Sequence, residues 1–92
     1  MILGVTDFLG HVRINVQTLE FWIEEEWLLP GDSEGERAFS ETDLARGFLI
    51  RDLTEGLGVN AEGVGVALHL VDQMYGLRRA LSEVLKSRDE QG

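Results

Sequence analysis

Carboxylates are the side chains most able to do chemistry in this sequence, and they are concentrated near its start. Residues 1–36 contain eight acidic residues and one base, Arg13, a formal charge of −7, whereas residues 37–92 carry −2. The acids are Asp7, Glu20, Glu24, Glu25, Glu26, Asp32, Glu34 and Glu36. Such a surface repels nucleic acid and attracts basic proteins. The charge distribution therefore predicts a basic protein partner.

Catalytic and metal chemistry have no comparable support. Two carboxylates can act as a general acid and base, but no nucleophile or apolar cleft is placed beside these acids. The chain has no cysteine, and His11 and His69 lie far apart in sequence, so we expect no metal and no cofactor. The segment 56–61, GLGVNA, matches letters of a dinucleotide fingerprint, but it follows an expected helix instead of a strand. We expect its glycines to end that helix, and the protein not to be an enzyme.

A chain of 92 residues, 43% hydrophobic, predicts one small globular domain over residues 1–92. No apolar run approaches the roughly 18 residues of a membrane-spanning helix. No basic stretch accompanies the apolar residues 1–5, so no signal peptide is expected. The lack of cysteine favours the cytoplasm.

Two short helices are expected to hold the acids. Thr6 is the predicted N-cap of a first helix that ends near His11, and Asn15 is the predicted cap of the second. The apolar face of the second helix comprises Val16, Leu19, Ile23 and Trp27. Its outer side carries Gln17, Glu20, Phe21, Glu24 and Glu25. An aromatic ring is thus expected among carboxylates.

A hairpin, or wing, is predicted after the second helix. Pro30 ends the helical pattern, and residues 31–35, GDSEG, have the composition of a tight turn. The flanking segments 28–29 and 37–39 are expected to pair as two very short strands. Ser40 and Asp43 then resemble a capping box that starts a third helix.

The third helix is expected to end at Gly56 and Gly58. Its apolar residues are Leu44, Phe48, Leu49, Ile50 and Leu53, which point in several directions and predict cover on more than one side. Asn60 is expected to cap a fourth helix that reaches about Lys86. Residues 1–59 would thus form the helix-turn-helix, wing and third helix, residues 60–87 the long helix, and residues 88–92 a frayed tail.

A helix of this length overhangs a small domain. Its far half needs either the first helices folded back on it or a second copy of the chain. The candidate dimer contacts are Met74, Leu77, Leu81, Val84 and Leu85. Whether the working form is a monomer or a dimer stays open at this point.

The order of short motifs resembles the MerR-type winged helix-turn-helix, through Leu28-Leu29-Pro30, Gly35, Arg37, Phe39, Asp43-Leu44, Leu53 and Gly58. More closely, the chain is similar to CbpM-type chaperone modulators, which share that scaffold. That similarity rests on Thr6-Asp7-Phe8, Leu28-Leu29-Pro30, Phe39, Leu57-Gly58-Val59-Asn60, Gly63-Val64 and Ala67-Leu68 with Leu70. It covers most of residues 5–85. The resemblance implies an all-α fold with a minimal two-stranded wing and a long C-terminal helix.

The same resemblance implies a small cytoplasmic protein that binds the J-domain of a CbpA/DnaJ-like co-chaperone and inhibits its stimulation of a DnaK-type chaperone. The chain departs from the MerR pattern at Trp27, where a glycine is common, and in its acidic wing. The expected partner-binding residues are Glu20, Phe21, Glu24, Glu25, Asp32, Glu34 and Glu36. The alternatives are a MerR-like DNA-binding transcription regulator and a purely structural dimerisation module.

Overall fold

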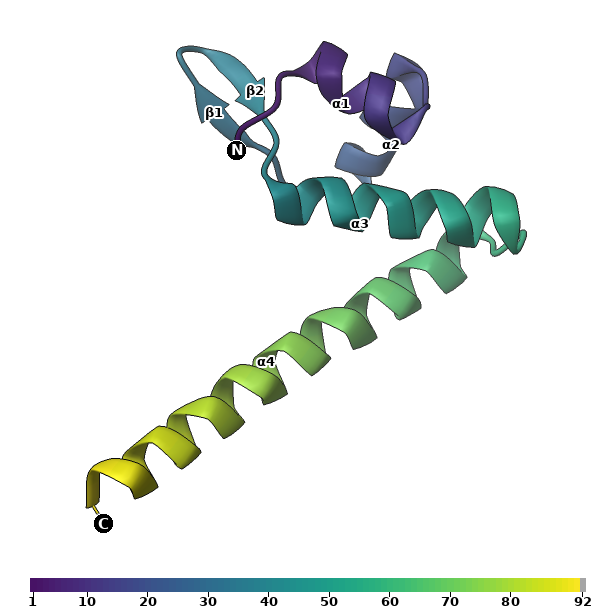
Figure 1. Cartoon of the computed structure of the whole chain (residues 1–92). Helices are drawn as coiled ribbons and strands as arrows, with labels where there is room; N and C mark the ends of the chain where they lie inside the picture. The colour runs from purple at the N-terminus through teal and green to yellow at the C-terminus, as the bar shows by residue number, and fades with distance from the viewer. Residues whose placement is uncertain (92) are drawn as a thin grey trace.

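Four α-helices and a two-stranded hairpin make up the structure, a computed structural model that describes residues 1–91 (Figure 1). The elements are α1 (Val5–Val12), α2 (Val16–Glu24), β1 (Gly31–Ser33), β2 (Glu36–Ala38), α3 (Glu41–Arg51), the π-helical turn η1 (Asp52–Gly56) and α4 (Ala61–Gln91). This is the predicted winged helix-turn-helix, mostly helical with a minimal two-stranded wing and a long last helix.

Three helices begin at the residues that the sequence predicts as caps. The side chain of Asn15 accepts a hydrogen bond from the backbone N–H of Thr18 at 2.8 Å, which satisfies a free donor at the start of α2. Asn60 does the same for α4. At the start of α3, Ser40 and Asp43 form the reciprocal capping box.

The start of α1 differs from the prediction. The helix begins at Val5, and its cap is Gly4, which makes no side-chain hydrogen bond, so Thr6 is not the N-cap. The reason lies just before the helix. Leu3 forms an isolated antiparallel bridge with Phe39 through two backbone hydrogen bonds of 2.8 Å, and the chain turns into the helix directly after that bridge.

The strands of the wing lie closer to its turn than the sequence predicts. Glu34 and Gly35 both have positive φ values, 54° and 82°, which form a two-residue turn of the kind favoured in hairpins. Because the turn uses only two residues, the strands are the residues beside it, with Gly31 opposite Ala38. The prediction that residues 28–29 pair with residues 37–39 was therefore wrong. Leu28 is buried in the core instead.

One hydrophobic core joins all four helices to the wing. Its buried members are Leu3, Phe8, Val12, Leu19, Trp22, Trp27, Leu28, Phe39, Ile50, Val64 and Leu68. Phe8 on α1 stacks on Phe39 at the base of the wing, with ring centroids 4.3 Å apart. Gly47 lets α1 and α3 approach closely, because a Cβ atom there would lie 2.9 Å from Cζ of Phe8. The core against which α2 packs is thus built from residues between Leu3 and Leu68.

The glycines after α3 act as the sequence predicts. The π-helical turn η1 ends at Gly56, and Gly58 has a φ of 66° that suits glycine. Helical residues and not a strand precede them, so the dinucleotide fingerprint does not apply. None of the helices in residues 1–91 combines the length and apolar character needed to cross a bilayer.

Helix α4 extends far beyond the core (Figure 1). Val64 and Leu68 are buried, but every side chain from Asp72 to Asp89 is exposed. The first helices do not fold back on it, so within one chain its far half is uncovered. The helix also continues to Gln91, through most of the predicted tail at residues 88–92; Gly92 lies outside the described residues.

Candidate functional site

Helices α1 and α2 form the helix-turn-helix. Arg13 closes α1 in the left-handed conformation, with a φ of 63°, and its N–H bonds to the carbonyl of Leu9. Asn15 caps α2 two residues later. Leu19 and Trp22 are buried, which turns the opposite side of α2 to the exterior. In proteins with this motif, the exposed side of the second helix meets the partner.

That exposed side carries no positive charge. No lysine or arginine occurs between Arg13 and Arg37, a span that includes all of α2 and β1. Glu24 and Glu25 are exposed at the end of α2. The charged residues of α2 and its C-cap are therefore all acidic, namely Glu20, Glu24 and Glu25.

An aromatic pair lies beside these carboxylates. The ring of Phe21 meets that of Trp27 edge-on, with centroids 5.5 Å apart and planes at 86°. Trp27 is only 6% exposed, whereas Phe21 is 43% exposed. Edge-to-face contact with a buried indole fixes the ring of Phe21. Phe21 thus presents an apolar surface of defined orientation among acidic residues, as the sequence predicts.

An ion pair connects α2 with the wing. The guanidinium of Arg37 on β2 donates to the carboxylate of Glu20 on α2, and both side chains are partly exposed. A pair in this environment adds at most about 1 kcal/mol to stability. The pair matters more for the surface charge, because Arg37 is the one cation of the wing and Glu20 neutralises it.

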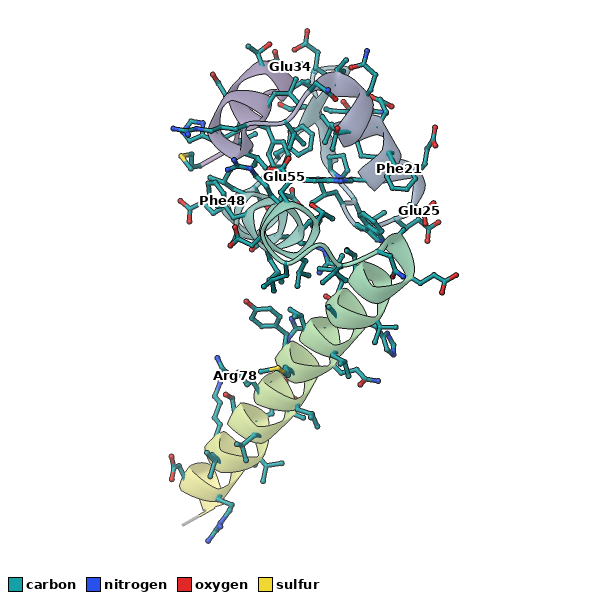
Figure 2. All side chains as sticks on the ribbon, turned by 90° about the vertical axis from the view of Figure 1, so that its right-hand side faces the viewer. Phe21, Glu25, Glu34, Phe48, Glu55 and Arg78 are labelled. Atoms are coloured by element: carbon teal, nitrogen blue, oxygen red, sulfur yellow. The ribbon has the colours of Figure 1, made fainter. Side chains whose placement is uncertain are left out.

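The predicted partner-binding residues fall into two groups. Phe21, Glu24 and Glu25 lie together at the end of α2, and Figure 2 shows Phe21 and Glu25 on the same side. The exposed acids of the wing are Asp32, Glu34 and Glu36, with Glu34 at the turn. Figure 2 places Glu34 away from Phe21 and Glu25. Glu20, bound to Arg37, lies where α2 meets the wing.

The structure also reveals a polar junction that sequence reasoning missed. Arg46 on α3 donates from Nε to the carbonyl oxygen of Trp27, and from Nη1 and Nη2 to the carboxylate of Asp72 on α4, at 2.6 and 3.2 Å. The hydrogen bond and positive charge of Arg46 hold the pKa of Asp72 below its usual value, against the opposing effect of burial. Arg46 and Asp72 are 26 residues apart, and no periodicity in the sequence connects them.

The far half of α4 carries a row of exposed apolar side chains. The predicted dimer contacts Met74, Leu77, Leu81, Val84 and Leu85 are each at least half exposed. Leu70, Met74, Leu77, Leu81 and Val84 follow one another at alternating spacings of four and three residues. This is the heptad spacing of a coiled-coil seam.

Both histidines make local contacts. Nδ1 of His11 lies 2.8 Å from the carbonyl oxygen of Asp7, and Nε2 of His69 lies 3.2 Å from the amide nitrogen of Gln73. The structure brings together no group of three or more potential metal ligands among residues 1–91. Each histidine therefore makes its contact within its own helix, α1 or α4.

Comparison with known proteins identifies the scaffold. The model of the MerR HTH family of regulatory proteins matches residues 3–86. The crystal structure of HiNmlR, a MerR family regulator lacking the sensor domain, bound to promoter DNA, has the same fold, with a TM-score of 0.69. The alignment covers 97% of this chain and 80% of that one, at 18% sequence identity. None of the curated proteins matches the chain significantly.

Proposed function

Because the chain belongs to the MerR HTH family of regulatory proteins, we propose that its helix-turn-helix surface regulates by binding a basic protein segment. The segment is the J-domain of a CbpA/DnaJ-like co-chaperone, and binding inhibits stimulation of a DnaK-type chaperone. This function needs no cofactor and no catalytic group, and it operates in the cytoplasm. In this proposal the chain differs from a DNA-binding relative in its partner, which is a protein and not DNA.

The observation that carries the proposal is the absence of positive charge between Arg13 and Arg37. DNA binding relies on lysine and arginine side chains that replace the counterions of phosphates. Here Glu24 and Glu25 would face those phosphates from α2, and Glu34 would do so from the wing. Salt screens charges over about 10 Å at 0.1 M, which is too far to relieve adjacent like charges.

The same surface suits a lysine- and arginine-rich helix, of the kind that J-domains as a family expose. Glu24 and Glu25 attract the helix over a distance, and Phe21 provides an apolar contact once it docks. A partly buried aromatic ring within a polar surround is a frequent centre of binding energy in protein interfaces. The proposed partner-binding residues remain Glu20, Phe21, Glu24, Glu25, Asp32, Glu34 and Glu36, centred on the group at the end of α2.

A DNA-binding transcription regulator is the second candidate. The observation in its favour is the fold shared with HiNmlR, whose structure contains promoter DNA. A helix-turn-helix with a wing can place α2 in the major groove and the wing on the backbone. In this chain, such a complex would have to form without a cation on α2 or at the wing turn.

We also propose that the working form is a homodimer joined through α4. Leucine, methionine and valine side chains on a heptad seam are costly to leave in water, and a second copy of α4 would cover them. Two copies would then present two acidic surfaces. A purely structural dimerisation module would share this property but bind no J-domain.

Two parallel titrations separate the candidates. Purified protein is titrated by calorimetry with the isolated J-domain of a CbpA/DnaJ-like co-chaperone, and by gel shift with DNA from upstream of its own gene. Saturable J-domain binding without a DNA shift supports the main proposal. A DNA shift without J-domain binding supports the transcription regulator instead. A dimer that binds neither probe supports the structural module.

A further inference from the structure

A recess lies next to the exposed end of α2. Its volume is about 260 Å³, and it opens between the loop after α2, the start of α3 and the first half of α4. The lining residues are Glu26, Trp27, Leu29, Asp43, Arg46 and Asp72. Three segments that are distant in sequence thus contribute to one depression, which borders the Phe21 and Trp27 pair.

The recess has an excess of negative charge. It contains three carboxylates and one guanidinium, that of Arg46. The hydrogen bonds of Arg46 are directed at Asp72 and at the carbonyl oxygen of Trp27, so its charge is compensated by groups already present. Asp43 accepts hydrogen bonds only from Ser40 among residues 1–89. Glu26 takes part in none of the ion pairs formed by those residues.

The rim of the recess is apolar on one side. Leu29 is 75% exposed, although it directly follows the buried Leu28. Lysine and arginine bury their aliphatic stems against apolar surface while the charged end finds an acceptor. Leu29 therefore suits the aliphatic stem of such a side chain, and Glu26 and Asp43, which form no ion pair with residues 1–89, suit its charged end.

We propose that this recess receives a lysine or arginine side chain of the basic protein partner. The stem lies against Leu29, and the charged end contacts Glu26 and Asp43. The inference rests on the proposed function, because it takes a basic protein as the occupant. It adds Glu26, Leu29 and Asp43 to the binding surface and makes Arg46 and Asp72 the residues that hold its far wall in place.

The test is an NMR titration of the whole 92-residue chain with two probes. The first is the isolated J-domain. The second is a helical peptide of leucine and lysine, compared with a peptide in which norleucine replaces each lysine and so keeps the stem without the charge. The reporters are the Nε–H signal of Arg46 and the indole N–H signal of Trp27, because both residues line the recess.

Glu26→Gln is the test variant, since it removes one charge with little change in size. Glu62→Gln is the matched control, because Glu62 is an exposed glutamate outside the acidic groups and the recess. The lysine peptide is expected to shift both reporters and to bind about fivefold more weakly to Glu26→Gln. Its affinity for Glu62→Gln should match that of the wild type, and the norleucine peptide should leave the reporters in place.

Equal weakening in the two variants, or equal shifts from the norleucine peptide, would overturn the inference. A J-domain that binds at Glu24 and Glu25 without moving the two reporters would also overturn it, while the proposed function stands. A lysine peptide that binds the recess, together with a J-domain that does not bind at all, supports the recess and removes the proposed partner. The two failures are therefore distinguishable.

Discussion

Arg46 on α3 holds the carboxylate of Asp72 on α4 through hydrogen bonds of 2.6 and 3.2 Å, from Nη1 and Nη2. The Nε of the same guanidinium donates to the carbonyl oxygen of Trp27. One side chain thus joins the end of the helix-turn-helix to the helix that leaves the domain. The junction positions the acidic surface relative to the apolar seam of α4.

The first prediction concerns the strength of that junction. Asp72→Asn should lower the free energy of unfolding by about 0.5 kcal/mol at neutral pH, since a half-exposed ion pair is largely screened by solvent. Urea unfolding measures the difference. Its pH dependence has a defined sign, because the pKa of Asp72 is lower in the folded protein than the ordinary 3.8. The difference in the free energy of unfolding between the wild type and Asp72→Asn should have its full value above pH 3.8. It should disappear as the pH falls through the folded-state pKa of Asp72. A difference that grows on acidification would contradict the assignment.

The second prediction concerns the approach of α1 to α3. Gly47→Ala should destabilise the fold by about 1 to 3 kcal/mol, because its Cβ would lie 2.9 Å from Cζ of Phe8 and 3.1 Å from Cγ2 of Val12. Gly76→Ala is the matched control. It lies on exposed α4 with no atom within 4 Å of the new Cβ, so it should stabilise by up to about 1 kcal/mol through helix propensity. Thermal unfolding of both variants checks the pair, and an equal effect of the two substitutions would refute the close packing.

The third prediction concerns the seam of α4. Leu77→Glu should convert the proposed dimer to a monomer, because two charged side chains would meet in an apolar interface. Leu57→Glu serves as the control, since Leu57 is 75% exposed, close to the 71% of Leu77, but lies before α4. Sedimentation equilibrium should give a dimer mass for the wild type and for Leu57→Glu only. A wild type that is monomeric at every concentration would exclude the dimer.

Local signals were sufficient to predict most of the fold. The caps Asn15, Ser40 and Asn60 act through hydrogen bonds to residues three positions away, so their chemistry is visible in a short stretch of sequence. The exposure of Phe21 also followed from helical spacing. Gly58 marked the end of a helix through its own conformational freedom.

The errors and omissions came from contacts between distant residues and from a turn whose position the local sequence leaves open. Thr6 was predicted as the N-cap of α1. The cap is Gly4, two residues earlier, because the chain enters the helix directly after the bridge between Leu3 and Phe39. The strand positions depend on a turn at Glu34 and Gly35 that could have been placed at several points in an acidic, glycine-containing loop. The recess beside α2 needs residues of α3 and α4, and only the folded chain brings these together.

The central claim is that the helix-turn-helix surface binds a basic protein through its charge. The most direct test is calorimetric titration with the J-domain at about 0.05 M and about 0.15 M salt, using the wild type and the double variant Glu24→Lys with Glu25→Lys. The account predicts saturable binding that weakens with salt and falls at least about tenfold in the double variant, whose thermal unfolding stays unchanged. Absence of saturable binding, or an affinity indifferent to both salt and the charge reversal, would contradict it.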